Sequence, residues 1–129
     1  AYDQMRNNPL FGAGLGHYGG AVAKRSFNVT YTDNYYLKTM AEMGLLGLTI
    51  FLGVILKTLR EGYESVKRLN NRGLKFMSAG ILAGLLAVVL HNAVENIFEI
   101  PYLNTYFWLM AGLLTALPYS DTKGGETIE

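Results

Sequence analysis

The stretch that decides the fold runs from Met40 to Leu56 and reads MAEMGLLGLTIFLGVIL, with Glu42 as its only charged residue. Two further apolar blocks follow, at about residues 76–90 and 102–117. Each block is shorter than the roughly 20 residues that cross a bilayer comfortably, and any one of them alone is also compatible with a buried helix of a soluble protein. Uncharged and aromatic flanks extend all three, as is typical of the membrane interface. We therefore predict an all-α, integral membrane fold with about three transmembrane helices.

The composition favours a membrane over a soluble setting. Hydrophobic residues make up 50% of the chain and charged residues 16%, whereas a typical soluble domain carries roughly a quarter charged residues. A soluble helical binding domain would also have amphipathic helices, but residues 44–56 and 80–90 are apolar on all sides. The net charge of +1 provides no basic excess for nucleic acid. The absence of cysteine excludes disulfides and thiolate catalysis.

The charged residues set the predicted topology. The connector at residues 57–75 is basic, and the positive-inside rule places it in the cytoplasm. It follows that residues 1–34 form an extracytoplasmic glycine-rich loop and that residues 35–117 form a three-helix transmembrane region. Residues 118–129 are polar for the most part, and we expect a disordered cytoplasmic tail there.

Two glycines in the second apolar block are candidates for helix packing. Gly80 and Gly84 stand four residues apart, so they share one face of a helix. Small residues on one face let another membrane helix approach closely. The alternative is that glycine is simply common in membrane helices.

Two short motifs precede the first apolar block. Residues 8–16 read NPLFGAGLG, and residues 33–37 read DNYYL before Ala41–Gly47 leads into the apolar segment. This order resembles the carboxy-terminal part of the O-antigen ligase and capsular polysaccharide polymerase family. In that family a Pro-Leu-Phe-Gly-Val-Gly-Leu-Gly element is followed by a His-Asn-x-x-Leu element before a membrane span. By this resemblance the chain is a fragment of a larger multi-span protein, and we expect the fragment alone to be inactive.

The resemblance implies a membrane glycosyltransferase of the bacterial cytoplasmic membrane. Such an enzyme transfers or polymerises a glycan from a polyprenyl-diphosphate carrier onto a glycan, lipid or protein acceptor, in cell-surface polysaccharide biosynthesis, without a cofactor or a metal. These motifs do not distinguish a polymerase from a ligase. The competing interpretation is a non-enzymatic membrane transporter or flippase component for a lipid-linked saccharide, whose glycine-rich loop and polar helix ends line a passage.

The first catalytic candidate is Asp33, which stands where many family members carry the histidine implicated in catalysis. A carboxylate at this position can accept a proton from a sugar hydroxyl as that hydroxyl attacks. The alternative is that Asp33 caps the helix that begins near Asn34, because aspartate is a strong N-cap. His17 of the glycine-rich loop is another candidate base.

His91 and Glu95 form a second catalytic candidate. If the second helix continues past them, His91, Glu95 and Glu99 fall on one face at spacings of four residues. Ionisable residues at a membrane boundary are functional candidates by default. The alternative is that they bond neighbouring helices or mark the exit to water. The spacing is not that of a zinc site, so we expect no metal.

The substrate-binding candidates lie in the two motifs and just before them. An arginine suits bidentate contact with a pyrophosphate, and the backbone amides of a glycine-rich loop suit an anion. The loop equally suits close packing against neighbouring helices. The spacing Gly14-x-Gly16-x-x-Gly19 does not indicate nucleotide binding, because the surrounding residues predict no strand before it and no helix after it. The candidates are Arg6, Gly12, Gly14, Gly16, Asn34 and Tyr36.

Overall fold

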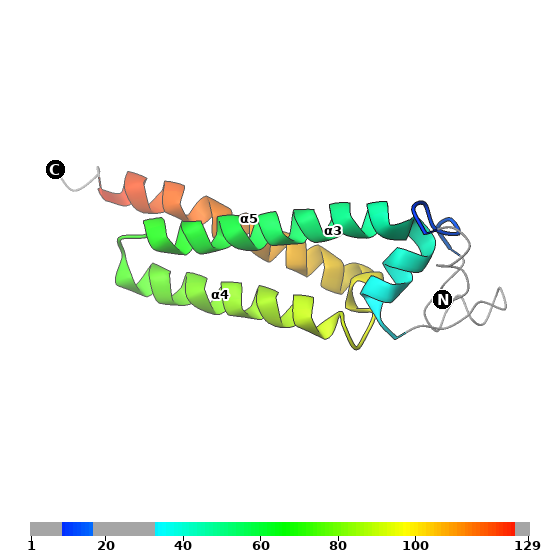
Figure 1. Cartoon of the computed structure of the whole chain (residues 1–129). Helices are drawn as coiled ribbons and strands as arrows, with labels where there is room; N and C mark the ends of the chain where they lie inside the picture. Colours follow the sequence, from blue (N-terminus) through cyan, green and yellow to red (C-terminus); the bar gives the residue numbers. More distant parts are fainter. Residues whose placement is uncertain (1–8, 17–32, 126–129) are drawn as a thin grey trace.

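The computed structural model describes residues 9–16 and 33–125, and this part of the chain is all-helical, as predicted. The helix α3 runs in the same direction as α5, and α4 is antiparallel to both (Figure 1). The elements are α3 (Tyr35–Arg68), α4 (Arg72–His91), the 3-10 helix η1 (Ile97–Glu99) and α5 (Pro101–Gly125).

Two of these helices, α3 and α4, are long and apolar enough to cross a membrane. Large apolar side chains remain exposed along them, among them Ile50, Leu56, Phe76 and Leu90. An extended apolar surface of this kind marks a face that meets lipid or another protein. The helix α5 is not among the candidate spans, so its crossing of a membrane stays a prediction.

The core lies where the three helices and η1 meet. Phe98 of η1 packs edge-on against Phe107 of α5, with ring centroids 4.9 Å apart, and against Phe51 of α3 at 5.9 Å. Such edge-to-face pairs add to the free energy gained from burial alone. The buried core residues are Ile55, Leu85, Phe98, Phe107, Ala111 and Leu114.

Gly62 of α3 lets α4 and α5 pack closely against α3. A Cβ atom added there would lie 2.7 Å from Leu114 Cδ2 and 3.3 Å from Leu82 Cδ1, so α4 and α5 both close on this position. Gly80 and Gly84 do not have the predicted packing role within the described residues, because a Cβ on either would meet nothing within 4 Å.

The predicted tail is more helical than expected, and the connector is mostly helical as well. Residues 57–75 are helical apart from 69–71, and residues 118–125 continue α5 instead of forming a disordered tail. One carboxylate ties the end of α5 to the connector. Asp121 Oδ2 accepts hydrogen bonds from the backbone amides of Asn70 at 2.7 Å and Asn71 at 3.2 Å. Hydropathy does not detect such a contact, because it joins two polar segments that are distant in the sequence.

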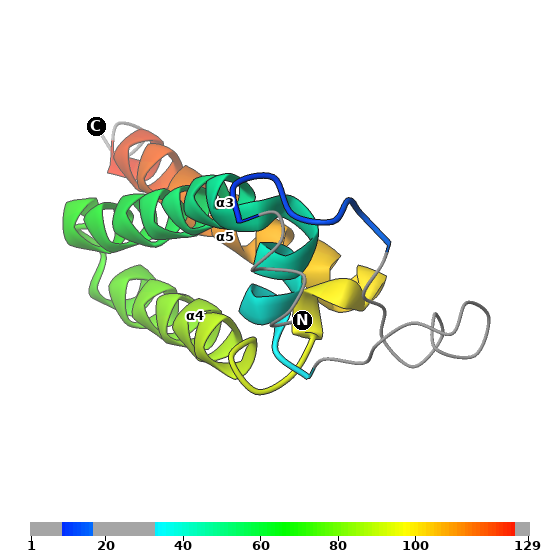
Figure 2. The ribbon, with the colours of Figure 1, turned by 45° about the vertical axis from the view of Figure 1, so that its right-hand side comes forward.

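The helix α3 is broken at Gly44, whose φ of 69° and ψ of −171° are not helical. The short part before Gly44 runs in a different direction from the long part after it (Figure 1). Residues 9–16 lie against this break, at the end of the bundle where α4 ends and α5 begins (Figure 2). We call this the glycine end of the bundle, and the end that holds residues 69–71 the connector end.

Candidate functional site

The break in α3 leaves backbone groups without helical partners, and residues 9–16 supply partners on both sides. After the break, the amide of Leu45 donates to the Pro9 carbonyl at 2.9 Å and that of Leu46 donates to the Leu10 carbonyl at 3.4 Å. Buried backbone groups are almost always paired. The glycine-rich segment therefore supplies the hydrogen-bond acceptors that the preceding helical turn would otherwise provide.

The carbonyl groups before the break are satisfied in the same way. Ala13 N donates to Ala41 O, and Gly14 N donates to Glu42 O, both at 2.9 Å. Together the two pairs of bonds attach an extended segment to both halves of a broken helix. The amides of Ala13, Gly14 and Gly16 are thus already engaged by α3, which favours packing against a neighbouring helix over an anion nest.

Gly12 and Gly44 permit this close approach. Both have a backbone φ of 69°, which residues other than glycine rarely adopt. A Cβ on Gly12 would lie 2.5 Å from the Glu42 carbonyl carbon, and a Cβ on Gly44 would lie 2.6 Å from Phe11 N. The direct contact of two backbones therefore explains why glycine stands at positions 12 and 44.

Glu42 is the buried carboxylate at the break, with 6% of its surface exposed. Its Oε1 accepts a hydrogen bond from the Gly16 amide at 3.1 Å. An ionisable residue within a candidate span is a functional candidate by default. Glu42 is the one charged residue of the first apolar block, and this position is the sequence signal that could have identified it. It was not among the candidates taken from the motifs.

The N-cap of α3 is Asn34, so the interpretation of Asp33 as the cap is wrong. Asn34 Oδ1 accepts hydrogen bonds from the amides of Tyr36 and Leu37, each at 3.0 Å. Asn34 is itself in an extended conformation, which is the geometry of an N-cap residue. Asp33 is exposed just before the cap, so its carboxylate is not required to start the helix.

Asn34 and Tyr36, predicted to bind substrate, both bond the end of α4. Asn34 Nδ2 donates to Ala93 O, and Tyr36 Oη donates to Val89 O, each at 2.6 Å. Tyr35 N also donates to Asn92 O at 3.0 Å. These contacts bring the motif that begins with Asp33 against the turn that contains His91 and Glu95.

His91, Glu95 and Glu99 do not share a helical face, so that prediction is wrong. The helix α4 ends at His91, and the fully buried Asn92 turns the chain by accepting from Phe98 N at 3.2 Å and donating to Val88 O at 2.9 Å. His91 and Glu95 are both exposed in this turn. An asparagine that bonds backbone groups on both sides competes with helix continuation.

Glu99 forms an ion pair with Lys38 instead, at 3.3 Å. Lys38 stands one helical turn before Glu42, so both lie on the same face of the first part of α3. The glycine end therefore has a half-buried group of polar side chains that the sequence motifs alone do not identify.

The described residues contain no group of three histidine, cysteine, aspartate or glutamate side chains that could hold a metal ion. Arg6 and His17 lie outside the described residues. Comparison of the chain with protein-family models, with curated proteins and with solved structures finds no match.

Proposed function

We propose that this chain belongs to a membrane glycosyltransferase of the O-antigen ligase and polysaccharide polymerase type. The enzyme transfers a glycan from a polyprenyl-diphosphate carrier to an acceptor hydroxyl outside the cytoplasm, and the chain lies in the bacterial cytoplasmic membrane with α3, α4 and α5 as spans. What supports this function is that the glycine-rich motif is bonded to the helix whose first residues form the Asp33 motif. Residues 9–16 are hydrogen-bonded to α3 on both sides of Gly44, in the same helix that the Asp33 motif begins.

The proposed chemistry needs a base for the acceptor and cations for the departing diphosphate. Asp33 is exposed directly before the N-cap of α3. We assign it the role of accepting the proton from the attacking hydroxyl. His91 and Glu95 lie in the exposed turn that the Asp33 motif contacts, and they are the second acid and base candidates. Stabilising the diphosphate requires preorganised positive charge.

That positive charge is not supplied by Lys38 of the glycine end, because Lys38 is paired with Glu99. We therefore assign diphosphate binding to Arg6 and to segments of the parent protein outside this chain. This assignment separates two roles. The described residues hold the acceptor and its base, and the carrier binds elsewhere.

A broken helix such as α3 is also a feature of the second candidate function, a transporter or flippase component. Discontinuous helices in membrane transporters direct free backbone groups at a substrate. Here, however, the amides of Leu45 and Leu46 and the carbonyls of Ala41 and Glu42 are bonded by residues 9–16. Backbone groups that are already paired offer less to a passing substrate, and this observation favours the transferase.

Deleting the parent gene distinguishes the two functions. Loss of a glycosyltransferase leaves lipid-linked single repeat units on the outer leaflet, where a periplasmic glycosidase releases their sugar. Loss of a flippase component leaves the same units on the inner leaflet, protected from that enzyme until the membrane is permeabilised. Accumulation on the inner leaflet would reject the transferase.

A further inference from the structure

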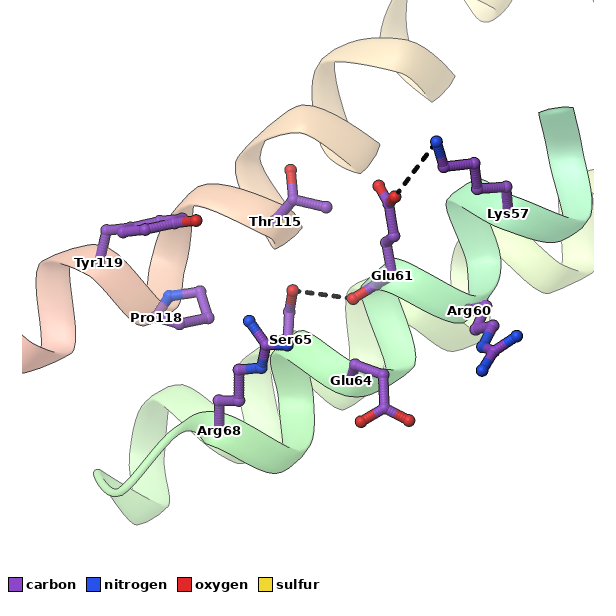
Figure 3. Close-up of a pocket in the computed structure, with 9 residues that line it drawn as sticks. All are labelled: Lys57, Arg60, Glu61, Glu64, Ser65, Arg68, Thr115, Pro118 and Tyr119. Atoms are coloured by element: carbon purple, nitrogen blue, oxygen red, sulfur yellow. Dashed lines mark hydrogen bonds and ion pairs between the residues drawn. The ribbon is translucent and has the colours of Figure 1, made fainter.

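An open groove of about 970 Å³ lies at the connector end of the bundle, between the last turns of α3 and α5 (Figure 3). Its cations are Lys57, Arg60 and Arg68, and α5 contributes Thr115 and Tyr119. This groove is far from the glycine end along the bundle axis (Figure 1), so the proposed transfer reaction does not use it.

Two carboxylates, Glu61 and Glu64, line the groove beside its three cations, so its positive charges are not fully compensated. Lys57 lies 3.9 Å from Glu61, and Glu64 lies 3.6 Å from Lys67. Arg68 forms no ion pair with the residues that the structure describes. An arginine guanidinium binds phosphate oxygens through two parallel hydrogen bonds.

Arg68 also points into the groove. Figure 3 shows its side chain reaching toward Ser65 and Pro118, between the two helices, whereas Arg60 points away from α5. The Ser65 hydroxyl is already used, because it donates to the Glu61 carbonyl at 2.8 Å. The guanidinium of Arg68 is therefore the group in the groove that is positioned to receive an anion.

The groove begins where the apolar surface of both helices ends. In α3 the last residue of the apolar block is Leu56, directly before Lys57, and in α5 it is Leu117, directly before Pro118. Leu56 and Leu113, on the apolar side of this boundary, are exposed. A ligand with an anionic head and apolar tails matches this order of surfaces, because basic residues at the cytoplasmic ends of membrane helices attract anionic head groups.

We propose that this groove binds the phosphate head group of an anionic membrane phospholipid, with Arg68 as the main ligand and the acyl chains along the exposed apolar faces of α3 and α5. The proposal rests on the membrane setting of the proposed function but not on its chemistry. A lipid held here would fix the connector end against the inner leaflet.

The test is native mass spectrometry of the purified full-length parent protein with phosphatidylglycerol and with phosphatidylcholine. We expect retention of phosphatidylglycerol over phosphatidylcholine, and a loss of about tenfold in phosphatidylglycerol affinity for Arg68→Gln, as removal of one charge-assisted contact implies. The control is Lys75→Gln, which removes a cation of α4 that does not line the groove. Arg68→Lys keeps the charge and should retain part of the affinity.

The outcomes are separable from those of the glycosyltransferase assay. Equal phosphatidylglycerol affinity in the wild-type protein and in Arg68→Gln would overturn the proposal, and so would an equal loss in Lys75→Gln. Displacement of the lipid by inorganic phosphate at a comparable concentration would show a free-phosphate site and reject a lipid site. The binding measurement contains no glycan, so failure of glycan transfer does not change its result. A raised melting temperature with phosphatidylglycerol, lost in Arg68→Gln, would support the assignment independently.

Discussion

Gly12 and Gly44 face one another across the break in α3, so closely that a Cβ on Gly12 would lie 2.6 Å from the Gly44 amide nitrogen. Neither residue has room for a side chain, and both have a φ of 69°. The contact joins the glycine-rich segment to the helix that the Asp33 motif begins. The glycine-rich motif is thereby fixed to α3 about two helical turns after the Asp33 motif.

Replacing either glycine should therefore destabilise the protein. We expect Gly44→Ala to lower the free energy of unfolding by at least about 2 kcal/mol, because alanine is strained at positive φ and its Cβ meets the backbone of residues 10–11. Thermal unfolding of the detergent-solubilised parent protein measures this. Gly53→Ala in the same helix is the matched control, because a Cβ there meets nothing within 4 Å. Equal melting temperatures for the two variants would contradict the packing account.

Glu42 should act as an anchor for residues 9–16 and not as the catalytic base. Glu42→Gln keeps an oxygen that can accept from the Gly16 amide, so we expect normal membrane level and normal polymer. Glu42→Ala leaves that amide unsatisfied and should cost about 1–3 kcal/mol of stability. Immunoblotting of membranes and polysaccharide gels measure both effects. Loss of polymer with normal protein in Glu42→Gln would move the catalytic role to Glu42.

The ion pair between Lys38 and Glu99 should contribute measurably to stability, because its side chains are only 14% and 30% exposed. A double-mutant cycle with Lys38→Met and Glu99→Gln should give a coupling free energy of about 1 kcal/mol or more. The pair of Lys57 and Glu61 is the control, with side chains 77% and 57% exposed. We expect a coupling below about 0.5 kcal/mol there. Equal coupling in both cycles would show that the glycine end is as solvated as the connector end.

Asp121 should hold the connector between α3 and α4 in place. In Asp121→Ala, we expect faster hydrogen exchange at the amides of Asn70 and Asn71, which lose their acceptor. Asp121→Asn retains a side-chain oxygen and should show a smaller increase. Unchanged exchange in Asp121→Ala would mean that α5 is held at the connector end by other contacts.

The apolar blocks predicted the positions of the three helices well but not their ends. Residues 40–56, 76–90 and 102–117 all lie inside helices, since apolar runs of this length need helical hydrogen bonding when buried. The helices extend into polar sequence because capping residues, and not hydropathy, set where they begin. Asn34 and Asn71 start α3 and α4, and hydropathy gives no weight to such residues.

The candidate site was less predictable than the fold. The break at Gly44 depends on residues 9–16, which lie far from it in the sequence, so no local pattern of α3 reveals it. The end of α4 depends on the bonds of Asn92 to Val88 and Phe98. The predicted common face of His91, Glu95 and Glu99 required the helix to continue, and it does not. The half-buried Lys38 and the buried Glu42 belong to neither motif, so the resemblance does not point to them.

The role proposed for Asp33 in activating the acceptor hydroxyl is tested by the chain length of cell-surface polysaccharide in cells that carry the full-length parent gene with Asp33→Asn. Membrane level is measured alongside, and Asp33→Glu is the control that keeps a carboxylate. We expect single repeat units with a normal protein level in Asp33→Asn, and partial polymer in Asp33→Glu. Long chains of normal length in Asp33→Asn, at normal protein level, would contradict this role.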